Sequence, residues 1–308
     1  MNVQQLALLA ICLGSALATN YTPVIAVISH PYNATHEAIP GSYVKYLEMG
    51  GARSLRFPFN ASDAYMDNVL ANTDGMFFIG GGESLPASAK YAYSVISGLQ
   101  DAGLPYAMWG TCNGFQWLTE LMAGHEKPND ILGSGYDAEE LNLALNFTGD
   151  AKVSRLFNPI SDYYEGIDLI GLLTDNAVTL NLHTYGFDPK DVEDIPDYTV
   201  LSTNLDRNGR EFVSSFEHAT RPIYGTQFHP EKNPFEYGAD SKTGVPVEPT
   251  IHTGLAVRHS FELARFFAGE AAKTGMNRWD PSSGLEIIYK DHAIIIENDY
   301  EEKYLFAI

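Results

Sequence analysis

The sequence is poor in cysteine and in basic residues, and it lacks a long apolar run after its N-terminal segment. Its 308 residues include 2 cysteines, 19 Lys or Arg and 39 Asp or Glu, and the formal net charge is -20. So negative a protein repels polyanions, which argues against nucleic acid or an anionic membrane as a partner. After the N-terminus no segment approaches the ~18 consecutive apolar residues of a membrane-spanning helix, so no membrane span is expected.

The N-terminus has the features of a secretory signal. An uncharged apolar stretch at 6–17 ends in Ala16-Leu17-Ala18, before a polar segment. No Lys or Arg precedes this stretch, but it is too short to span a bilayer and its small residues are typical of a cleavage site. We therefore expect a signal peptide over residues 1–18 and one mature domain over residues 19–308.

Asn-x-Ser/Thr sequons also indicate a secreted protein. Their asparagines are Asn20, Asn33, Asn60 and Asn146. Each sequon alone is weak evidence, but together with the signal they predict passage through a glycosylating secretory pathway, with glycans on surface loops. The expected destination is the extracellular space or the lumen of a lysosome or vacuole.

Apolar runs alternate with helical patterns in the first half of the chain. The predicted strands are 24–29, 53–57, 75–79 and 105–109, and the predicted helices between them are 41–50, 62–72 and 84–102. Continuous apolar strands of this kind are typical of a parallel sheet that helices cover on both faces. The second half predicts strands at 179–183, 199–204, 212–216, 223–228, 285–289 and 293–296, and a helix at 253–274. The predicted fold is α/β, with a doubly wound, mostly parallel central sheet, helices on both faces and antiparallel additions in the second half.

Cys112 is the one thiol left after removal of the signal, which contains Cys12. It lies in the segment GTCNGFQWL directly after a predicted strand, between Gly110 and Gly114. Small residues at this spacing permit the strained strand-turn-helix elbow that presents a nucleophile. The amides at the start of the following helix would favour a thiolate and bind an oxyanion. A buried inert cysteine is the alternative, and the flanking glycines favour the nucleophile.

His229 is the predicted partner of this thiol. It follows the strand-like segment YGTQF and precedes Pro230-Glu231-Lys232. A histidine at a strand end can transfer protons, and Glu231 would orient its ring and stabilise the cation. The residues thus predict a Cys-His-Glu triad in that chain order. His252 and His259 lack a third ligand at suitable spacing, so no metal site is expected.

The segments WGTCNGFQ and YGTQFHPEK resemble the class I glutamine amidotransferase-like superfamily. FFIGGG, LNFTG and NLHTYGF, with the signal peptide, are most similar to its gamma-glutamyl hydrolase family, and the resemblance runs from about Pro23 to the C-terminal YLF. It implies a catalytic domain over residues 19–308 that cleaves γ-glutamyl amide bonds of folylpoly-γ-glutamates and antifolate analogues, and releases glutamate or γ-glutamyl peptides. It further implies a thioester mechanism without a metal or organic cofactor, a small-molecule substrate and a homodimer.

The resemblance also implies roles for individual residues. Cys112 is the nucleophile, His229 the acid and base, and Glu231 the residue that orients the histidine. The backbone amides of Gly81 and Asn113 form the oxyanion hole.

The sequence also offers candidate substrate-binding residues. His183 resembles a family histidine near the scissile bond. Gln116 stands where vertebrate members of the family carry Glu, and Gln at this position is typical of the amidotransferase relatives. A polyanionic substrate needs a local basic patch, for which Lys232 is the favoured candidate, because Arg53 and Arg56 are interpreted as solvated charges at a strand edge.

The sequence leaves other functions open. One is a glutaminase-type amidotransferase subunit, which the secretory signal and the expected absence of an acceptor domain argue against. The other is a non-catalytic folate-binding or γ-glutamyl-binding protein, which the intact Cys112, His229 and Glu231 argue against.

Overall fold

The computed structural model describes residues 22–124, 131–158, 166–240, 242–275, 278–291, 293–295 and 302–308. The predicted signal peptide, with Cys12, and the sequon at Asn20 lie outside these residues.

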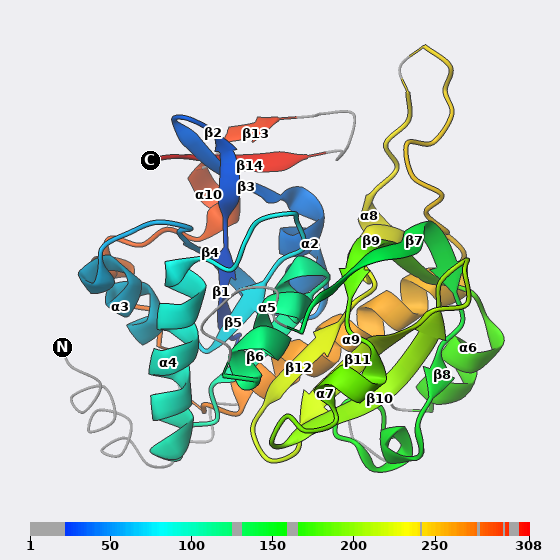
Figure 1. Ribbon diagram of the computed structural model, residues 1–308. Helices are drawn as coiled ribbons and strands as arrows, with labels where there is room; N and C mark the ends of the chain where they lie inside the picture. Colours follow the sequence, from blue (N-terminus) through cyan, green and yellow to red (C-terminus); the bar gives the residue numbers. More distant parts are fainter. Residues whose placement is uncertain are drawn as a thin grey trace.

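An eight-stranded sheet forms the centre of the molecule, in the order β4-β1-β5-β6-β12-β11-β10-β8 (Figure 1). In that order the strands are Arg53–Phe57, Val24–Ile28, Gly75–Phe78, Ala107–Thr111, Ile223–Thr226, Glu211–His218, Tyr198–Leu205 and Asn146–Phe147. The pairs from β4 to β12 are parallel, and β11, β10 and β8 are joined to them by antiparallel pairs. The predicted mostly parallel sheet with antiparallel additions is confirmed.

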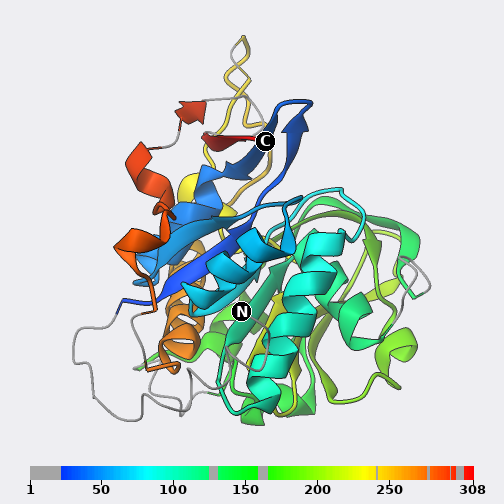
Figure 2. The same ribbon diagram turned by 90° about the vertical axis from the view of Figure 1, so that its left-hand side faces the viewer.

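Helices cover both faces of this sheet. Figure 2 shows α9 (Gly254–Ala272) on one side of the strands and α4 (Ala87–Asp101) on the other. Helix α2 (Gly41–Met49) packs against α9, whereas α3 (Asp63–Ala71) and α5 (Asn113–Met122) pack against α4. Each of these segments has apolar residues at helical spacing, which is why the sequence predicted them as helices.

The remaining strands form smaller sheets that depend on pairing between distant segments. One sheet has the order β13-β14-β3-β2, with strands Ala293–Ile295, Lys303–Ala307, His36–Pro40 and His30–Asn33, and the other pairs β7 (Gly133–Leu143) with β9 (Thr179–Gly186). The short helices are α6 (Leu169–Asp175), α7 (Pro189–Val192), α8 (Lys232–Phe235), α10 (Ile288–Asp291) and the 3-10 turns Gly149–Val153 and Pro281–Ser283. The predicted strand at 285–289 is wrong, because the chain there enters α10 after a single bridge from Ile287 to Leu55.

Aromatic side chains join helix α9 to the sheet. Phe267 of α9 lies 5.7 Å from both Phe77 of β5 and Trp109 of β6, measured between ring centroids, and all these side chains are fully buried. Aromatic pairs at such distances stabilise a core beyond their buried area. Among the described residues, no helix is both long and apolar enough to cross a membrane.

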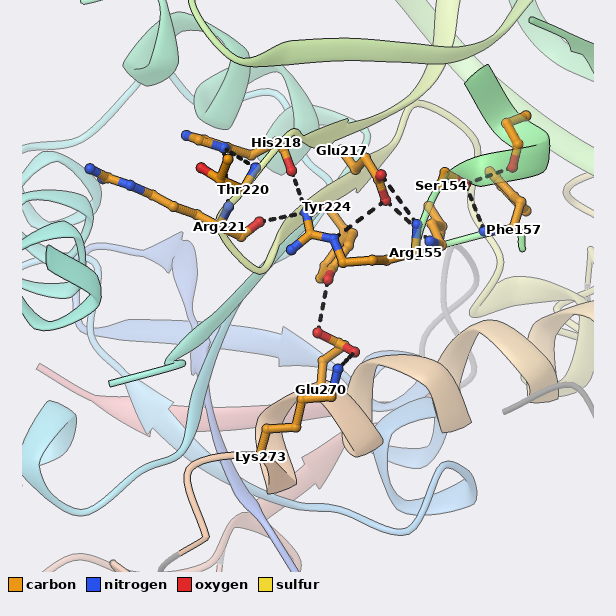
Figure 3. Close-up of polar contacts among 12 residues, drawn as sticks. Ser154, Arg155, Phe157, Glu217, His218, Thr220, Arg221, Tyr224, Glu270 and Lys273 are labelled. Carbon is orange, nitrogen blue, oxygen red and sulfur yellow. Dashed lines mark hydrogen bonds and ion pairs between the residues drawn. The ribbon is translucent and has the colours of Figure 1, made fainter. Parts of the chain in front are cut away.

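A cluster of charged side chains around Arg155 lies at the end of the sheet where the parallel strands begin (Figure 3). Arg155 donates to the carbonyls of His218 and Arg221 in the β11–β12 turn, and its guanidinium lies 5.2 Å from the Tyr224 ring. The backbone amides of Arg155 and of the residue after it donate to the buried Glu217 carboxylate. Burial raises the pKa of Glu217, and Arg155 opposes that rise. The cluster therefore depends on the cation of Arg155.

We predict that Arg155→Ala lowers the free energy of unfolding by about 2 kcal/mol, because Glu217 would stay buried without its cation. The matched control is Arg207→Ala, which removes an exposed ion pair with Asp137 and should cost less than about 1 kcal/mol. Denaturant unfolding of both variants measures the difference. Equal losses in the two variants would contradict the assigned role of Arg155.

Candidate active site

Cys112 occupies the predicted elbow between β6 and α5. Its backbone has a φ of 51°, in the left-handed region that residues other than glycine rarely adopt. The glycines on either side are required by packing: a Cβ on Gly110 would lie 2.4 Å from the Gly114 carbonyl oxygen, and a Cβ on Gly114 would lie 2.1 Å from that of Phe78. The G-x-C-x-G spacing thus reflects close contact of α5 with two strands.

His229 reaches this elbow because β6 and β12 are neighbouring parallel strands. Thr111 pairs with Thr226 in register, and the Cys112 amide donates to the Thr226 carbonyl at 2.9 Å. Both chains therefore leave the sheet at the same edge. The His229 amide donates to the Leu180 carbonyl at 2.9 Å, which fixes the segment that carries the imidazole.

The imidazole of His229 lies between a carboxylate and the thiol. Its Nδ1 is 2.7 Å from Oε1 of Glu231, and both side chains are buried. Burial alone would lower the pKa of His229, but the Glu231 carboxylate and then Cys112, including a hydrogen bond with the thiol, raise it to about 10. A proton on Nδ1 that is directed at Glu231 leaves Nε2 for proton transfer. The arrangement can thus hold an imidazolium beside a thiolate.

A glycine turn after β5 completes the surroundings of these groups. A Cβ on Gly80 would lie 2.7 Å from Cε1 of His229 and 2.6 Å from the hydroxyl of Tyr43. The Gly80 amide donates to that hydroxyl at 2.8 Å, and the same hydroxyl is 3.4 Å from Nδ1 of His229. Tyr43 is fully buried at the start of α2. Tyr43 is not among the residues predicted from the sequence, because its position in a helical pattern carries no sign of a link to His229.

Gly81 and Asn113 lie side by side on the cleft. A Cβ on Gly81 would be 3.7 Å from Oδ1 of Asn113, and the His30 ring packs directly behind Gly81. Asn113 is the first residue of α5, so its N–H has no acceptor in a preceding helical turn. The two residues predicted for the oxyanion hole are therefore brought together beside Cys112.

The cleft at the nucleophile has a volume of about 300 Å³. It is lined by Gly81, Gly82, Glu83, Ser84, Cys112, Asn113, Gln116, Leu132, Glu139, Leu182, His183, Thr184 and Tyr185. Glycine-turn, elbow and β9 residues thus surround one space that is suited to a small molecule.

Of the substrate-binding candidates, His183 and Gln116 line this cleft. The His183 ring contacts the Tyr185 carbonyl through Nδ1 at 2.8 Å, and burial lowers its pKa to about 4. Gln116 donates from Nε2 to the Tyr185 carbonyl at 3.1 Å and to Oε1 of Gln227 at 3.2 Å. A neutral imidazole and an amide therefore border the space beside the thiol.

The basic candidates do not line the cleft. The Lys232 side chain is 1% exposed, and its ammonium group is paired with Glu248 at 2.7 Å. Arg56 is paired with the buried Glu37 at 2.8 Å, so its interpretation as a solvated edge charge is wrong. Arg53 lies over the Trp279 ring at 5.0 Å. The basic patch predicted for a polyanionic substrate is thus not formed by these side chains.

His252 and His259, on or next to helix α9, are held within the fold. His252 contacts the Asn233 carbonyl at 2.6 Å and stacks on Tyr237. His259 is fully buried, and burial lowers its pKa to about 4. In the part of the chain that the structure describes, no group of three His, Cys, Asp or Glu side chains is arranged to hold a metal ion.

Comparison with known proteins gives consistent matches. The family model for glutamine amidotransferase class-I matches residues 36–241. The gamma-glutamyl hydrolase of Rattus norvegicus is 32% identical over 244 residues, which cover 76% of this chain and 71% of the relative. Those of Mus musculus and Homo sapiens are each 31% identical over 87% of this chain and cover 83% and 82% of the relatives.

We predict that Glu231→Gln slows alkylation of Cys112 by iodoacetamide about tenfold near pH 7. Without the carboxylate, burial lowers the pKa of His229, so the imidazolium that stabilises the thiolate is lost at lower pH. The matched control, Glu262→Gln, changes a buried glutamate that is paired with Arg258 on α9 and should leave the profile unchanged. Identical pH profiles of alkylation for Glu231→Gln and the unmodified protein would contradict the proposed role of Glu231.

Proposed function

Because the chain belongs to the gamma-glutamyl hydrolase family of class-I glutamine amidotransferases, we propose that it hydrolyses γ-glutamyl amide bonds through a thioester on Cys112. The observation that carries this proposal is the buried contact of His229 with Glu231, beside Cys112, which lines the cleft. The relatives are named for hydrolysis of the same bond. The narrower substrate that we propose is a folylpoly-γ-glutamate or an antifolate analogue.

In the first half of the reaction, the thiolate of Cys112 adds to the γ-amide carbonyl carbon. The carbonyl oxygen becomes an oxyanion, which the N–H groups of Gly81 and Asn113 stabilise. His229 then gives its Nε2 proton to the amide nitrogen, the carbon-nitrogen bond breaks, and the amine leaves. The γ-glutamyl group stays on the sulfur as a thioester.

In the second half, neutral His229 removes a proton from water, and the resulting hydroxide adds to the thioester carbonyl. Collapse of the second tetrahedral intermediate expels the Cys112 thiolate and releases the γ-glutamyl carboxylate, while His229 is again protonated. Glu231 holds the ring in one orientation through both halves. Each step uses only side chains, backbone amides and water.

Tyr43 contacts both the glycine turn and the histidine that transfers protons. Its hydroxyl accepts the Gly80 N–H, and this contact fixes the turn whose next residue, Gly81, supplies an amide to the oxyanion. The same hydroxyl faces Nδ1 of His229. Because Gly80 has no room for a side chain between Tyr43 and His229, a shift of the turn would displace the acid and base as well.

We also propose that the protein enters the secretory pathway and carries glycans. The asparagines of the described sequons, Asn33, Asn60 and Asn146, are all exposed, as glycosylation requires. The extracellular space and the lumen of a lysosome or vacuole are the proposed destinations. The homodimer implied by family resemblance stays a prediction.

The proposed function predicts that the protein converts folylpenta-γ-glutamate to shorter folates with release of glutamate or γ-glutamyl peptides. Cys112→Ala should lower this rate at least about 10³-fold, because Cys112 is the one thiol among the described residues that line the cleft. Chromatography of the products, with free glutamine as a second substrate, measures both. Release of ammonia from glutamine without cleavage of the folate would favour an amidotransferase subunit, and full turnover by Cys112→Ala would rule out the mechanism.

For Tyr43→Phe we predict that kcat falls about tenfold while KM changes less than about twofold, since an indirect loss should cost less than removal of an oxyanion donor. The matched control is Tyr106→Phe, which removes a buried hydroxyl bonded to Thr73, away from the site. Steady-state kinetics on the folate substrate measure both variants. Similar kcat values for both variants would show that Tyr43 acts only in folding.

A further inference from the structure

His30 lies at the edge of the sheet from which the catalytic segments leave. Strand β1 ends at Ile28 and His30 opens β2, while β5 leads into the glycine turn at residues 80–82. Strands β1 and β5 are parallel neighbours, so both chains leave the sheet at their carboxyl ends. This is the edge at which open α/β sheets bind ligands. His30 is therefore placed beside the turn that supplies the Gly81 amide.

The imidazole of His30 packs directly against Gly81. A Cβ on Gly81 would lie 2.4 Å from Nδ1 and 2.5 Å from Cε1 of His30. Both distances are too short for a side chain, so the ring fills the space next to the glycine. Burial lowers the pKa of His30 to about 4, although Glu37 opposes this, and the ring is therefore neutral near neutral pH. The contact is one of shape, without a charge on the ring.

Aromatic neighbours fix the ring of His30 in turn. Measured between ring centroids, Trp117 of α5 is 5.2 Å away and Phe59 is 6.0 Å away. Trp117 also donates from Nε1 to the Glu83 carbonyl at 3.1 Å, so the same side chain contacts His30 and the chain after the glycine turn. The Phe59 amide donates to the buried Glu37 carboxylate at 2.9 Å. Helix α5 and the segment after β4 thus hold the ring that packs against the turn.

We infer that His30 is a positioning residue, whose ring sets the place of the Gly81 amide in the oxyanion hole. Glycine has wide backbone freedom, so the direction of its N–H depends on what packs around it. Tyr43 and Trp117 hold the chain before and after Gly81 through hydrogen bonds, and the ring supports the glycine between them. Without the ring the turn can shift, and a displacement of about 1 Å can slow a reaction about 100-fold. This inference rests on the proposed function and deepens it.

The test measures hydrolysis and thiol reactivity in the same variants. Hydrolysis of p-aminobenzoyl-di-γ-glutamate needs the oxyanion hole, whereas alkylation of Cys112 by iodoacetamide displaces iodide from a saturated carbon and forms no oxyanion. In His30→Ala, kcat should fall about 30-fold, less than the about 10²–10³-fold of a removed donor, while KM and the alkylation rate change less than about twofold. His30→Gln keeps a planar polar group of similar reach and should recover kcat to within about threefold.

A second variant tests the same support from its other side. Trp117→Phe removes the hydrogen bond to Glu83 but keeps an aromatic ring next to His30. We expect kcat to fall about fivefold with an unchanged alkylation rate, because the turn loses one of its supports. This variant carries the test if His30→Ala does not fold.

The matched control is His218→Ala, at the opposite end of the strands. His218 is buried, and its Nδ1 accepts the backbone N–H groups of Thr220 and Arg221. Its loss should lower the denaturation midpoint and leave kcat unchanged.

The inference would be overturned by an unchanged kcat in both His30→Ala and Trp117→Phe, or by kcat and the alkylation rate falling together in these variants. The hydrolase function would stand in either case. Failure of the unmodified protein to hydrolyse any γ-glutamyl substrate would overturn the proposed function and the role of His30 together.

Discussion

The close contact of helix α5 with the ends of β5 and β6 is the constraint on which the active site depends. Gly114 lies so near the Phe78 carbonyl that no side chain fits, and its amide donates to Ile79 at 3.1 Å. This contact holds Cys112 at a φ of 51°, a strain that typically costs about 1–3 kcal/mol. The strained turn aims the thiol at the cleft and leaves the Asn113 amide beside it, so packing energy elsewhere in the core supports the geometry of catalysis.

The active site has a buried pair of charged groups and a separate set of exposed carboxylates. The buried contact of His229 with Glu231 raises the pKa of the histidine to about 10, so a cation is held next to the thiol despite burial. Burial lowers the pKa of His183 to about 4, and the contact with the Tyr185 carbonyl offsets this only in part. Nearer to solvent, Glu83 and Glu139 add negative charge around the entrance. The buried pair of His229 and Glu231 serves the chemistry, whereas the exposed carboxylates border the cleft.

Local patterns in the sequence were enough to predict the parallel sheet, its covering helices and the elbow at Cys112. Long-range contacts were not readable: β14 pairs with β3 from the other end of the chain, and Tyr43 reaches His229 across 186 positions. The carboxylate partners of the basic candidates were unreadable for the same reason: Glu37 binds Arg56, and Glu248 binds Lys232. Side-chain charge is visible in a sequence, but its partner in the fold is not.

The central claim is that the γ-glutamyl group passes through a thioester on Cys112. Rapid acid quenching during turnover of a γ-glutamyl substrate, followed by mass spectrometry of the digested protein, tests it most directly. The account predicts that the peptide containing Cys112 gains the mass of the acyl group, and that the Cys112→Ala protein shows no such gain. Rapid turnover without any acylated peptide, or acylation of another residue, would contradict it.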